Sequence, residues 1–450
     1  MSSQCLVNER IVEREVTDRT RGLMNQEEFK SRHRANGRCF VRRRALPFVR
    51  TLLLVLQKTL RSVQLHLNDF LGQLAGSEWV SSVTGAAWSQ ARAKLKHTAF
   101  IELNQRAILE VVYDRPDQFE VRRWRGFRVI AIDSSLVRVP DELGEIFGWV
   151  ECRNQNGPTG RFAQARLSSA YDVLNRLGLE TKLVPWKSGE RALAAEHLAR
   201  SEPQDLSLSD RGYASYEWFA RHAKAQRHFV CRCETGTFGI VRQLFAANEA
   251  GRSVRAILRP PHGQETAMRE AGLPEGIEVR FVTLRLPSGE LEVLATSLLD
   301  EARYPTECFY ELYGLRWGVE TYYDVLKGRL ALENFSGRTE EAVRQDVFAA
   351  VFLSNLETVI IRGAQKRLDQ TSQHRQYPLQ VNKAVSFHAL KSHVISLLAS
   401  TQPLPEVLQR LEELFLQKPT SVRQDRVPPR RKCSGWISYH YQRNRRKVVF

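Results

Sequence analysis

The sequence predicts an α/β fold in which two strands of one sheet end in acidic residues. Strand-like runs alternate with helices between residues 127 and 233, in the order β-β-β-α-β-α-β. The runs are short, rich in β-branched residues and separated by turn signals. The first run ends at Asp133 and the fourth at Asp210. Apolar residues recur at helical spacing in the segments before and after this region. We therefore expect helices on the N-terminal and C-terminal sides of the strand-rich region in the sequence.

The middle of the chain supplies the sheet. The strands are predicted at Phe127–Ile132, Phe162–Val173, Leu177–Pro185, Asp205–Ser209 and Arg227–Cys233, with helices at Glu190–Arg200 and Tyr216–Ala225. Asn175–Gly178 fits a hairpin turn between the second and third strands.

Charge and cysteine content restrict the class of protein. The chain has 450 residues, a net charge of +17 and a pI of about 9.8, which favours a polyanionic partner such as nucleic acid. The seven cysteines are odd in number and form no Cys-x-x-Cys pair, so neither a disulfide framework nor a zinc ribbon is expected. The polar N-terminus and the short apolar runs predict no signal peptide and no membrane span. We therefore expect a cytoplasmic protein.

The N-terminal third is predicted to be helical. Residues 1–40 are polar and are interpreted as a loose or partly helical arm, and residues 41–74 as a long amphipathic helix or a helix pair. Ser81–Lys96 begins with capping residues and would present a tryptophan and three basic side chains. These are Trp88, Arg92, Lys94 and Lys96. Both a DNA-binding helix and an ordinary solvated basic helix fit this pattern.

The C-terminal half begins with a different pattern. Residues 234–300 combine turn signals with strand-like runs and are interpreted as a β-rich subdomain inserted into the core. Helices are predicted at about 305–330 and 340–367, the second apolar on one face. The tail from Arg423 is basic and aromatic, so it fits either a DNA-gripping segment or a disordered tail.

One helix carries four polar residues at regular spacing. Tyr313, Arg316, Glu320 and Lys327 have offsets of 0, 3, 7 and 14, which fall within roughly 60° of one helix face. Such a stripe would present a phenol, a guanidinium, a carboxylate and an ammonium together. The alternative is an ordinary solvated polar face of a helix, on which this spacing arises by chance.

Three acids in this pattern fit phosphodiester chemistry. Taken singly, Asp133 and Asp210 also fit turn or helix-capping aspartates. Together with Glu320, they could hold two divalent cations, which stabilise the attacking and leaving oxygens of an in-line displacement. Hard carboxylate oxygens suit Mg²⁺ or Mn²⁺.

These motifs resemble a known family. Tyr313-x2-Arg316-x3-Glu320-x6-Lys327 is similar to the signature of insertion-sequence-4 family transposases, which belong to the DDE (Asp-Asp-Glu) transposases. Asp210-Arg-Gly-Tyr213 and Asp133-Ser-Ser resemble the motifs of the family's second and first acids. The likeness extends from roughly residue 81 to 355.

The resemblance implies a ribonuclease-H-like catalytic core with a β-rich insertion, an α-helical N-terminal DNA-binding region, and cut-and-paste transposition. It implies that Asp133, Asp210 and Glu320 are the catalytic metal ligands for Mg²⁺ or Mn²⁺, with two ions expected. Tyr313, Arg316 and Lys327 would contact DNA at the transposon end. Arg211, beside the second acid, and the basic residues Arg92, Lys94 and Lys96 are further candidate DNA contacts.

The expected partners are double-stranded DNA, as terminal inverted repeats and as target, and a second copy of the chain that pairs the ends. No membrane partner is expected. The expected domains are an arm (1–40), a helical DNA-binding region (41–120), the first part of the core (121–233), the insertion (234–300), the rest of the core (301–370), and a C-terminal helical region with a basic tail (371–450).

The insertion differs from that of some relatives, which form a hairpin at the transposon end and stack a flipped base on a tryptophan. This chain has no tryptophan between Gly236 and Leu315. Other aromatic residues would have to stack instead. These are Phe238, Phe245, Phe281, Phe309 and Tyr310.

Two alternatives remain open: a ribonuclease-H-like nuclease without strand transfer, and a retired transposase that only binds DNA. Neither a phosphate-binding Gly-x4-Gly-Lys loop nor a Gly-x-Ser-x-Gly elbow occurs, so nucleotide and ester hydrolysis are unsupported.

Overall fold

The computed structural model describes residues 3–42, 44–59, 62–75, 83–114, 120–154, 157–400 and 402–422. The chain divides into two compact units, each built from several segments. The sheet unit comprises residues 122–136 and 166–323, and the helical unit comprises residues 1–121, 137–165 and 324–450. The predicted basic tail from Arg423 lies outside the described residues.

The sheet unit alternates strands and helices along the chain. Its elements, three of which extend into the other unit, are β1 (Arg128–Arg138), β3 (Gly157–Asp172), β4 (Leu177–Pro185), α9 (Glu190–Ala199), β5 (Asp205–Ser209), α10 (Tyr216–Ala225), β6 (His228–Cys233), α11 (Gly239–Ala247), β7 (Ser253–Leu258), α12 (Glu265–Glu270), β8 (Ile277–Arg285), β9 (Leu291–Thr296), α13 (Cys308–Gly314) and α14 (Trp317–Asp324).

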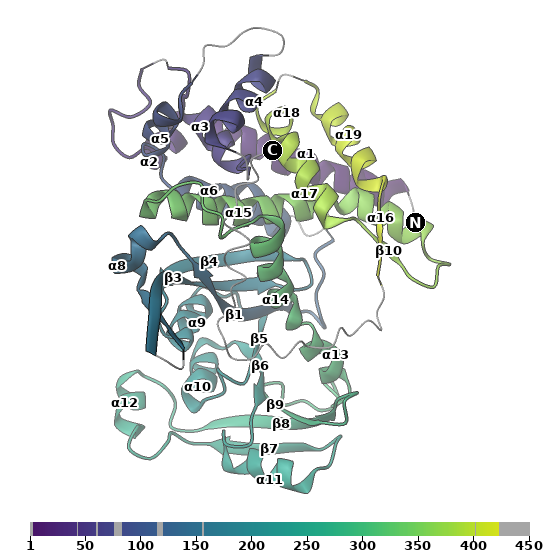
Figure 1. Ribbon diagram of the computed structural model, residues 1–450. Coiled ribbons are helices and arrows are strands. Elements are labelled where there is room, and N and C mark those ends of the chain that lie inside the picture. The colour runs from purple at the N-terminus through teal and green to yellow at the C-terminus, as the bar shows by residue number, and fades with distance from the viewer. Residues whose placement is uncertain are drawn as a thin grey trace. The chain divides into compact units, whose positions relative to one another are not determined.

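The sheet is mixed. Its strand order is β3-β1-β5-β6-β9-β8-β7, with β4 paired to β3 (Figure 1). The central strands β1, β5 and β6 run parallel, whereas β9, β8 and β7 follow in antiparallel pairs. The prediction of a mixed α/β fold is thereby confirmed.

The predicted strands agree with the structure apart from three differences. The first strand does not end before Asp133, because β1 continues to Arg138. The run at residues 234–300 does not form a sheet of its own. Its strand β9 pairs with β6, so β7, β8 and β9 extend the central sheet, and α11 and α12 lie between the strands in sequence. β2 (Trp149–Asn154), which pairs with the first half of β3, was not predicted.

Helices cover one face of this sheet. Ile130 of β1 and Phe229 of β6 belong to a core cluster that also contains Ala194 of α9, Phe219 of α10 and Val241 of α11. Because side chains alternate across a strand, the residues next to these core positions point to the opposite face. That opposite face is where the candidate site lies.

The helical unit contains the remaining elements. They are α1 (Ser3–Asn25), α2 (Glu27–His33), α3 (Phe48–Leu56), α4 (Val63–Ala75), α5 (Gly85–Arg92), α6 (Thr98–Leu103), η1 (Asn104–Leu109), α7 (Glu110–Asp114), η2 (Asp141–Leu143), α8 (Gly144–Phe147), β2, η3 (Val325–Arg329), α15 (Glu340–Ile360), α16 (Arg362–Thr371), β10 (Leu379–Gln380), α17 (Lys383–Ser392), α18 (Val394–Leu398), α19 (Leu404–Leu416) and β11 (Thr420–Ser421).

α15 is the central helix of the helical unit. It was predicted to be apolar on one face, but nearly every residue from Ala342 to Ile360 is buried, because α3, α6 and α1 pack around it. The predicted continuation to residue 367 is interrupted by a 45° bend before α16. No single helix among the described residues is long and apolar enough to cross a membrane, and α15 with α16 meets that test only as a bent pair.

The N-terminal segment is more ordered than predicted. The expected loose or partly helical arm forms α1 and α2, with Val12, Val16 and Phe29 buried in the helical unit. The expected helix or helix pair at 41–74 forms a pair, α3 and α4. Cys39, Cys152, Cys231, Cys233 and Cys308 are free thiols.

Arg92 is a structural residue. The sequence predicted an exposed basic helix, but on α5 the side chain of Arg92 is only 4% exposed and that of Trp88 only 6%. The Arg92 guanidinium donates to Asp346 Oδ1 at 2.7 Å and to Gln345 Oε1 at 2.7 Å. These partners lie on α15, about 250 positions along the chain, so sequence periodicity could not reveal them. Arg92 is therefore withdrawn as a DNA contact.

Replacing Arg92 by leucine is expected to lower the free energy of unfolding by about 3–5 kcal/mol, because Asp346 would remain as a buried charge without its main partner. Urea denaturation measures the change. The control is Lys96→Leu, at an exposed position just beyond the same helix, which should alter stability by less than about 0.5 kcal/mol. Equal stability of the two variants would contradict the assignment.

Candidate active site

Two acids lie side by side because of the register between β1 and β5. The parallel pairing runs from Arg128 opposite Asp205 to Ala131 opposite Leu208. Asp133 follows two residues later within β1, and Asp210 follows two residues later, just beyond the end of β5 at Ser209. The two acids therefore lie near the same end of neighbouring parallel strands, which are about 4.8 Å apart.

Both acids point to the sheet face opposite the helix-covered core. Ile132 belongs to the core cluster, so alternation directs the adjacent Asp133 to the other face. Ser209 accepts a hydrogen bond from the buried Trp218 of α10 at 3.2 Å, which directs Asp210 away from the core in the same way. The two acids therefore share one surface.

Two tyrosines fasten α13 and α14 to this surface (Figure 1). Tyr323 donates through its hydroxyl to the backbone carbonyl of Asp133 at 2.8 Å and to that of Leu167 at 3.2 Å. Tyr313 donates to the carbonyl of Ser209, next to Asp210, at 3.3 Å. Glu320 lies one helical turn before Tyr323, so these bonds bring the third acid to the first two.

Gly318 allows α14 to approach the sheet closely. A β-carbon at this position would lie 3.2 Å from Cγ1 of Val173, tighter than ordinary packing. The missing side chain therefore lets the helix, and with it Glu320, pack directly against the end of β3.

The charges of the three acids interact. Burial raises the pKa of Asp133 to about 6, and the carboxylates of Asp210 and Glu320 add to this rise, while the Ser134 N–H and Arg316 oppose it. The carboxylates of Asp210 and Glu320 thus lie close enough to influence the charge of Asp133.

Each acid keeps one oxygen open. Asp133 Oδ1 accepts from the Ser134 N–H at 2.8 Å, and Asp210 Oδ1 accepts from the Gly212 N–H at 2.8 Å. Glu320 Oε1 accepts from Arg316 at 2.8 Å. The second oxygen of each carboxylate accepts no hydrogen bond from the described residues. Hard oxygen donors of this kind suit Mg²⁺ or Mn²⁺.

Arg316 supplies the positive charge of the site. Its side chain is 7% exposed, and its guanidinium lies 4.6 Å from the ring of Trp317. Nε is buried without a hydrogen-bond partner among the described residues. No three His, Cys, Asp or Glu side chains in the described part of the chain form a group that could hold a metal ion.

The predicted single stripe is interrupted. α13 ends at Gly314, a turn covers Leu315 and Arg316, and the chain becomes π-helical from Val325. The four signature residues therefore do not lie along one straight helix, because a turn and a π-helix each change the rotation per residue. Tyr313 and Arg316 stay with Glu320 in the sheet unit, whereas the half-buried Lys327 belongs to the helical unit.

A polar network beside Asp133 was missed from the sequence. Ser134 Oγ donates to Glu190 Oε1 at 2.6 Å and accepts from Arg166 at 2.8 Å, and Arg166 also pairs with Glu190. The available signal was the basic residue Arg166 inside the strand predicted at Phe162–Val173. Arg191 of α9 donates to the Gly212 carbonyl at 2.9 Å, which supports the loop that carries Asp210.

Comparison with known proteins identifies the chain. The family model described as "Transposase DDE domain" matches residues 124–356, more than half of the 450 residues. The chain belongs to the DDE-domain transposases. The matched segment begins just before β1 and ends within α15, so it contains all three acids.

Proteins that are similar to this chain in sequence are also named as transposases. The transposase InsG of insertion sequence element IS4 from Escherichia coli (strain K12) is 21% identical over 315 residues, 68% of each chain. A Sinorhizobium fredii protein named "Putative transposase y4zB" is 26% identical over 50% of this chain and 59% of its own. The solved piggyBac transposase synaptic complex with hairpin DNA aligns over 92% of this chain and 84% of that one, with 10% identity and a TM-score of 0.41.

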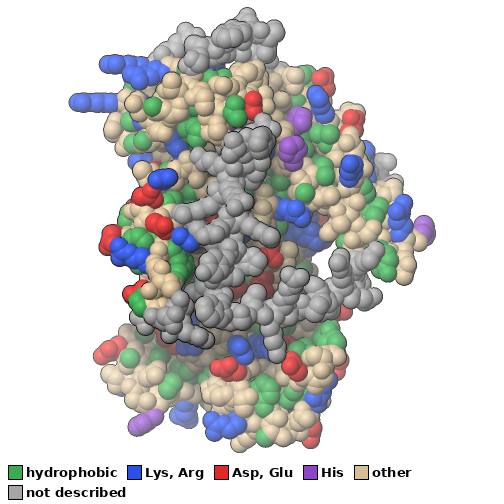
Figure 2. Space-filling view, in the orientation of Figure 1, with side chains coloured by type: hydrophobic (Ala, Val, Ile, Leu, Met, Phe, Trp, Pro, Cys, Tyr) green, Lys and Arg blue, Asp and Glu red, His purple; other side chains and the backbone are tan. Residues whose placement is uncertain are grey.

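The transposase has a basic hollow on its helical unit. Arg38, Arg42, Arg44 and Lys94 line a depression of about 470 Å³ near α2 and α5, and the three arginines are exposed. Figure 2 shows Lys and Arg side chains projecting from the region labelled α2 and α5 in Figure 1. The arginines were missed from the sequence, although the run Val41–Arg44 was a signal. Lys94 is half-buried, and Lys96 nearby is exposed.

The remaining predicted contacts differ in exposure. Arg211 is exposed and lies 3.7 Å from Glu234, whereas Tyr313 is 5% exposed. Among the aromatic candidates for base stacking, Phe281 and Phe309 are fully buried, and Tyr310 is 46% exposed. A stacking role for the two buried phenylalanines would require the local packing to open.

Changing Tyr323 to phenylalanine is expected to cost about 1–3 kcal/mol of stability, because the buried carbonyls of Asp133 and Leu167 lose a donor. Thermal and urea unfolding measure this loss. The control Tyr310→Phe, on the exposed side of α13, should change stability by less than about 0.5 kcal/mol. An unchanged stability of the Tyr323 variant would exclude the anchoring role.

Proposed function

We propose that this transposase cuts DNA at the ends of an insertion sequence and joins the ends to target DNA, with Asp133, Asp210 and Glu320 as the catalytic acids. The observation that supports the proposal is the parallel pairing of β1 with β5, which carry Asp133 and Asp210 at or just beyond their neighbouring ends, with Glu320 on α14, whose Tyr323 bonds to the carbonyl of Asp133. A core of the ribonuclease-H-like type is part of the proposal, supported by the parallel strands β1, β5 and β6.

The three acids suit Mg²⁺ or Mn²⁺, two ions in the full complex. When bound, such ions stabilise the charge that develops on the attacking and leaving oxygens at phosphorus. The protein's own part is to hold the three carboxylates at fixed positions through β1, β5 and α14. Arg316, released from Glu320, can then donate to a DNA phosphate.

The reaction has two in-line steps at phosphorus. In the first, water attacks the phosphodiester at the element's end, the P–O3′ bond breaks, and the leaving oxygen takes a proton to become a 3′-hydroxyl. In the second, that 3′-hydroxyl attacks a target phosphodiester, which forms a new P–O bond and releases the target's own 3′-hydroxyl. One site serves both steps because the geometry at phosphorus is the same.

Each unit contributes its own proposed DNA contacts. In the sheet unit, Arg211 and Arg316 lie close in sequence to Asp210 and Glu320. Tyr313, three residues before Arg316, is proposed as a further contact. In the helical unit we propose the basic hollow and Lys96 as the surface for the inverted repeat, in place of Arg92. Lys327 is proposed to contact the transposon end. Pairing two ends calls for two copies of the chain, so a homodimer on DNA is expected.

The decisive test is Glu320→Gln, which keeps the side-chain size and removes the charge. We expect Mg²⁺-dependent nicking of DNA carrying the element's end to fall to background, while binding of that DNA in a gel-shift assay is retained. Glu311→Gln, at an exposed position of α13, is the matched control and should cleave normally. Normal nicking by the Glu320 variant would overturn the catalytic assignment.

A joining assay separates transposition from simple nuclease action. A pre-cut end with a free 3′-hydroxyl should become covalently linked to target DNA in the presence of Mg²⁺. Cleavage without joining would favour the nuclease, and binding without either would favour a DNA-binding protein.

Replacing Arg42 and Arg44 together by glutamine should weaken DNA binding and flatten its salt dependence. Each lost phosphate contact lowers the slope of log affinity against log salt by about 0.9. Fluorescence anisotropy over a salt series measures the slope. The exposed Arg410 of α19 provides the control, Arg410→Gln. If all these variants have the wild-type slope, the basic hollow is not the DNA surface.

A further inference from the structure

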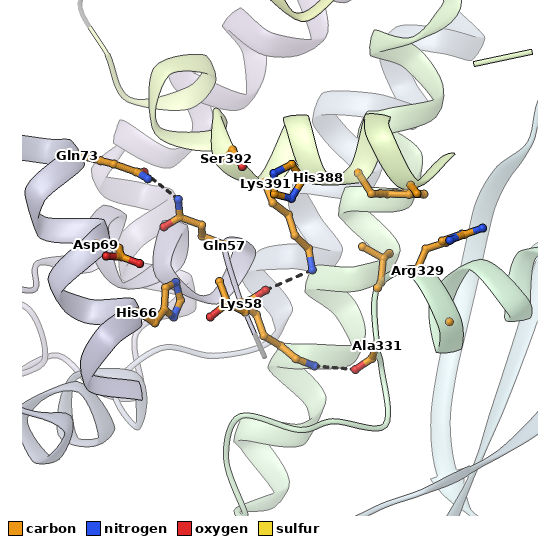
Figure 3. A pocket seen from close by; sticks show the side chains of 15 residues that line it. Gln57, Lys58, His66, Asp69, Gln73, Arg329, Ala331, His388, Lys391 and Ser392 are labelled. Carbon is orange, nitrogen blue, oxygen red and sulfur yellow. Dashed lines mark hydrogen bonds between the residues drawn. The ribbon is translucent and has the colours of Figure 1, made fainter. Parts of the chain in front are cut away.

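A second polar pocket lies within the helical unit, apart from the three acids in sequence. It has a volume of about 540 Å³ and is lined by residues from the end of α3, from α4, from the turn after η3 and from α17 (Figure 3). This volume is in the range of sites for small ligands. Its titratable lining residues are Lys58, His66, Asp69, Arg329, His388 and Lys391.

Two lysines face each other in this pocket. Lys391 donates to the backbone carbonyl of Lys58 at 3.2 Å, and Lys58, only 8% exposed, donates to the carbonyl of Ala331 at 3.3 Å. In Figure 3 both side chains extend into the same space between α3 and α17. Holding two ammonium groups together in a buried place is unfavourable unless negative charge compensates them.

The protein supplies too little negative charge for this cluster. The carboxylate of Asp346 lies 3.9 Å from Lys58 Nζ, but it is already paired with Arg92 at 2.7 Å. Burial lowers the pKa of Lys391 to about 8, and Lys58 lowers it further, while Asp346 opposes the change. The buried Asp346 and the exposed Asp69 of the pocket lining thus face three cations, Lys58, Lys391 and Arg92.

His66 adds an unused hydrogen-bonding atom. Its Nε2 is buried and has no hydrogen-bond partner among the described residues. Burial lowers the pKa of His66 to about 4, so the ring is neutral at pH 7 and Nε2 can carry a proton to donate. Figure 3 shows His66 on the side of Lys58, whereas the Arg329 guanidinium points away from the lysine pair.

We propose that this pocket binds a phosphate group, with Lys58 and Lys391 supplying charge and His66 a hydrogen bond. Donors from α3, α4 and α17 approach from different directions, as the oxygens of a tetrahedral anion require. The phosphate can come from the DNA backbone or from a free nucleotide. The DNA source rests on the proposed function, whereas the pocket's affinity for phosphate does not.

The first test uses inorganic phosphate and deoxyadenosine monophosphate as probes of the full-length protein. Both should raise the melting temperature with increasing concentration. Lys391→Met should lose this response, while its melting temperature without ligand equals or exceeds the wild-type value because the ammonium repulsion is gone. A lysine with a purely structural role would instead lower it.

Two further variants sharpen this test. Lys418→Met removes a lysine exposed on the same unit and should respond to phosphate like the wild type. His66→Leu removes the hydrogen-bond donor but no charge, so it should weaken the response even if the Lys391 variant does not fold. The proposal is overturned if neither probe stabilises the wild type, or if both pocket variants respond normally.

The second test identifies the source of the phosphate. DNA binding is measured without Mg²⁺ in the Glu320→Gln background, so cleavage plays no part. If DNA supplies the phosphate, Lys391→Met should reduce the salt slope by about 0.9 and Lys418→Met should not. Stabilisation by the free probes with an unchanged DNA slope assigns the pocket to a free nucleotide. Absence of catalytic activity would not affect the melting-temperature test or the DNA-binding test, because neither measurement depends on cleavage.

Discussion

The parallel register of β1 and β5 is the constraint on which the candidate site depends. It brings the ends of the two strands that lead to Asp133 and Asp210 together, an arrangement that the like charges of the two acids oppose. The bonds that fasten the neighbouring helices to these strands go to main-chain carbonyls and not to the carboxylates. The hydroxyls of Tyr313 and Tyr323 bond to main-chain carbonyls, so the helices are fixed while one oxygen of each carboxylate stays open.

Arg316 balances this concentration of negative charge. A buried guanidinium beside three carboxylates lowers their repulsion, and its bond to Glu320 is made by one edge of the fork while Nε remains without a partner. Arg316 can therefore act as a counter-ion for Glu320 and can also donate a hydrogen bond to an anion. A divalent ion at the acids would take over the first role and favour the second.

The sequence could predict the local part of this site. Asp133, Asp210 and Glu320 follow patterns that lie within a few residues, namely a β-branched strand or a polar helical stripe. The break after Gly314 escaped prediction because Tyr313 and Arg316 keep helical spacing on either side of a turn. Arg92 was misassigned because its partner Asp346 is distant in sequence. A basic residue beside helix formers looks the same whether water or a buried carboxylate surrounds it.

The strands β7, β8 and β9 show a similar limit. Their turn signals suggested a separate subdomain, yet hydrogen bonds from β9 to β6 continue the sheet. Sequence patterns mark where a strand begins and ends, but the partner of an edge strand is decided by tertiary contacts.

The location of the positive charge likewise depends on tertiary contacts. The net charge of +17 predicted a polyanion, but only the packing of α3, α4 and α17 shows that part of this charge is buried without enough carboxylate to neutralise it. Buried excess charge must be met by a ligand or lost by deprotonation, which is why the proposed phosphate pocket rests on Lys391 and not on the exposed arginines.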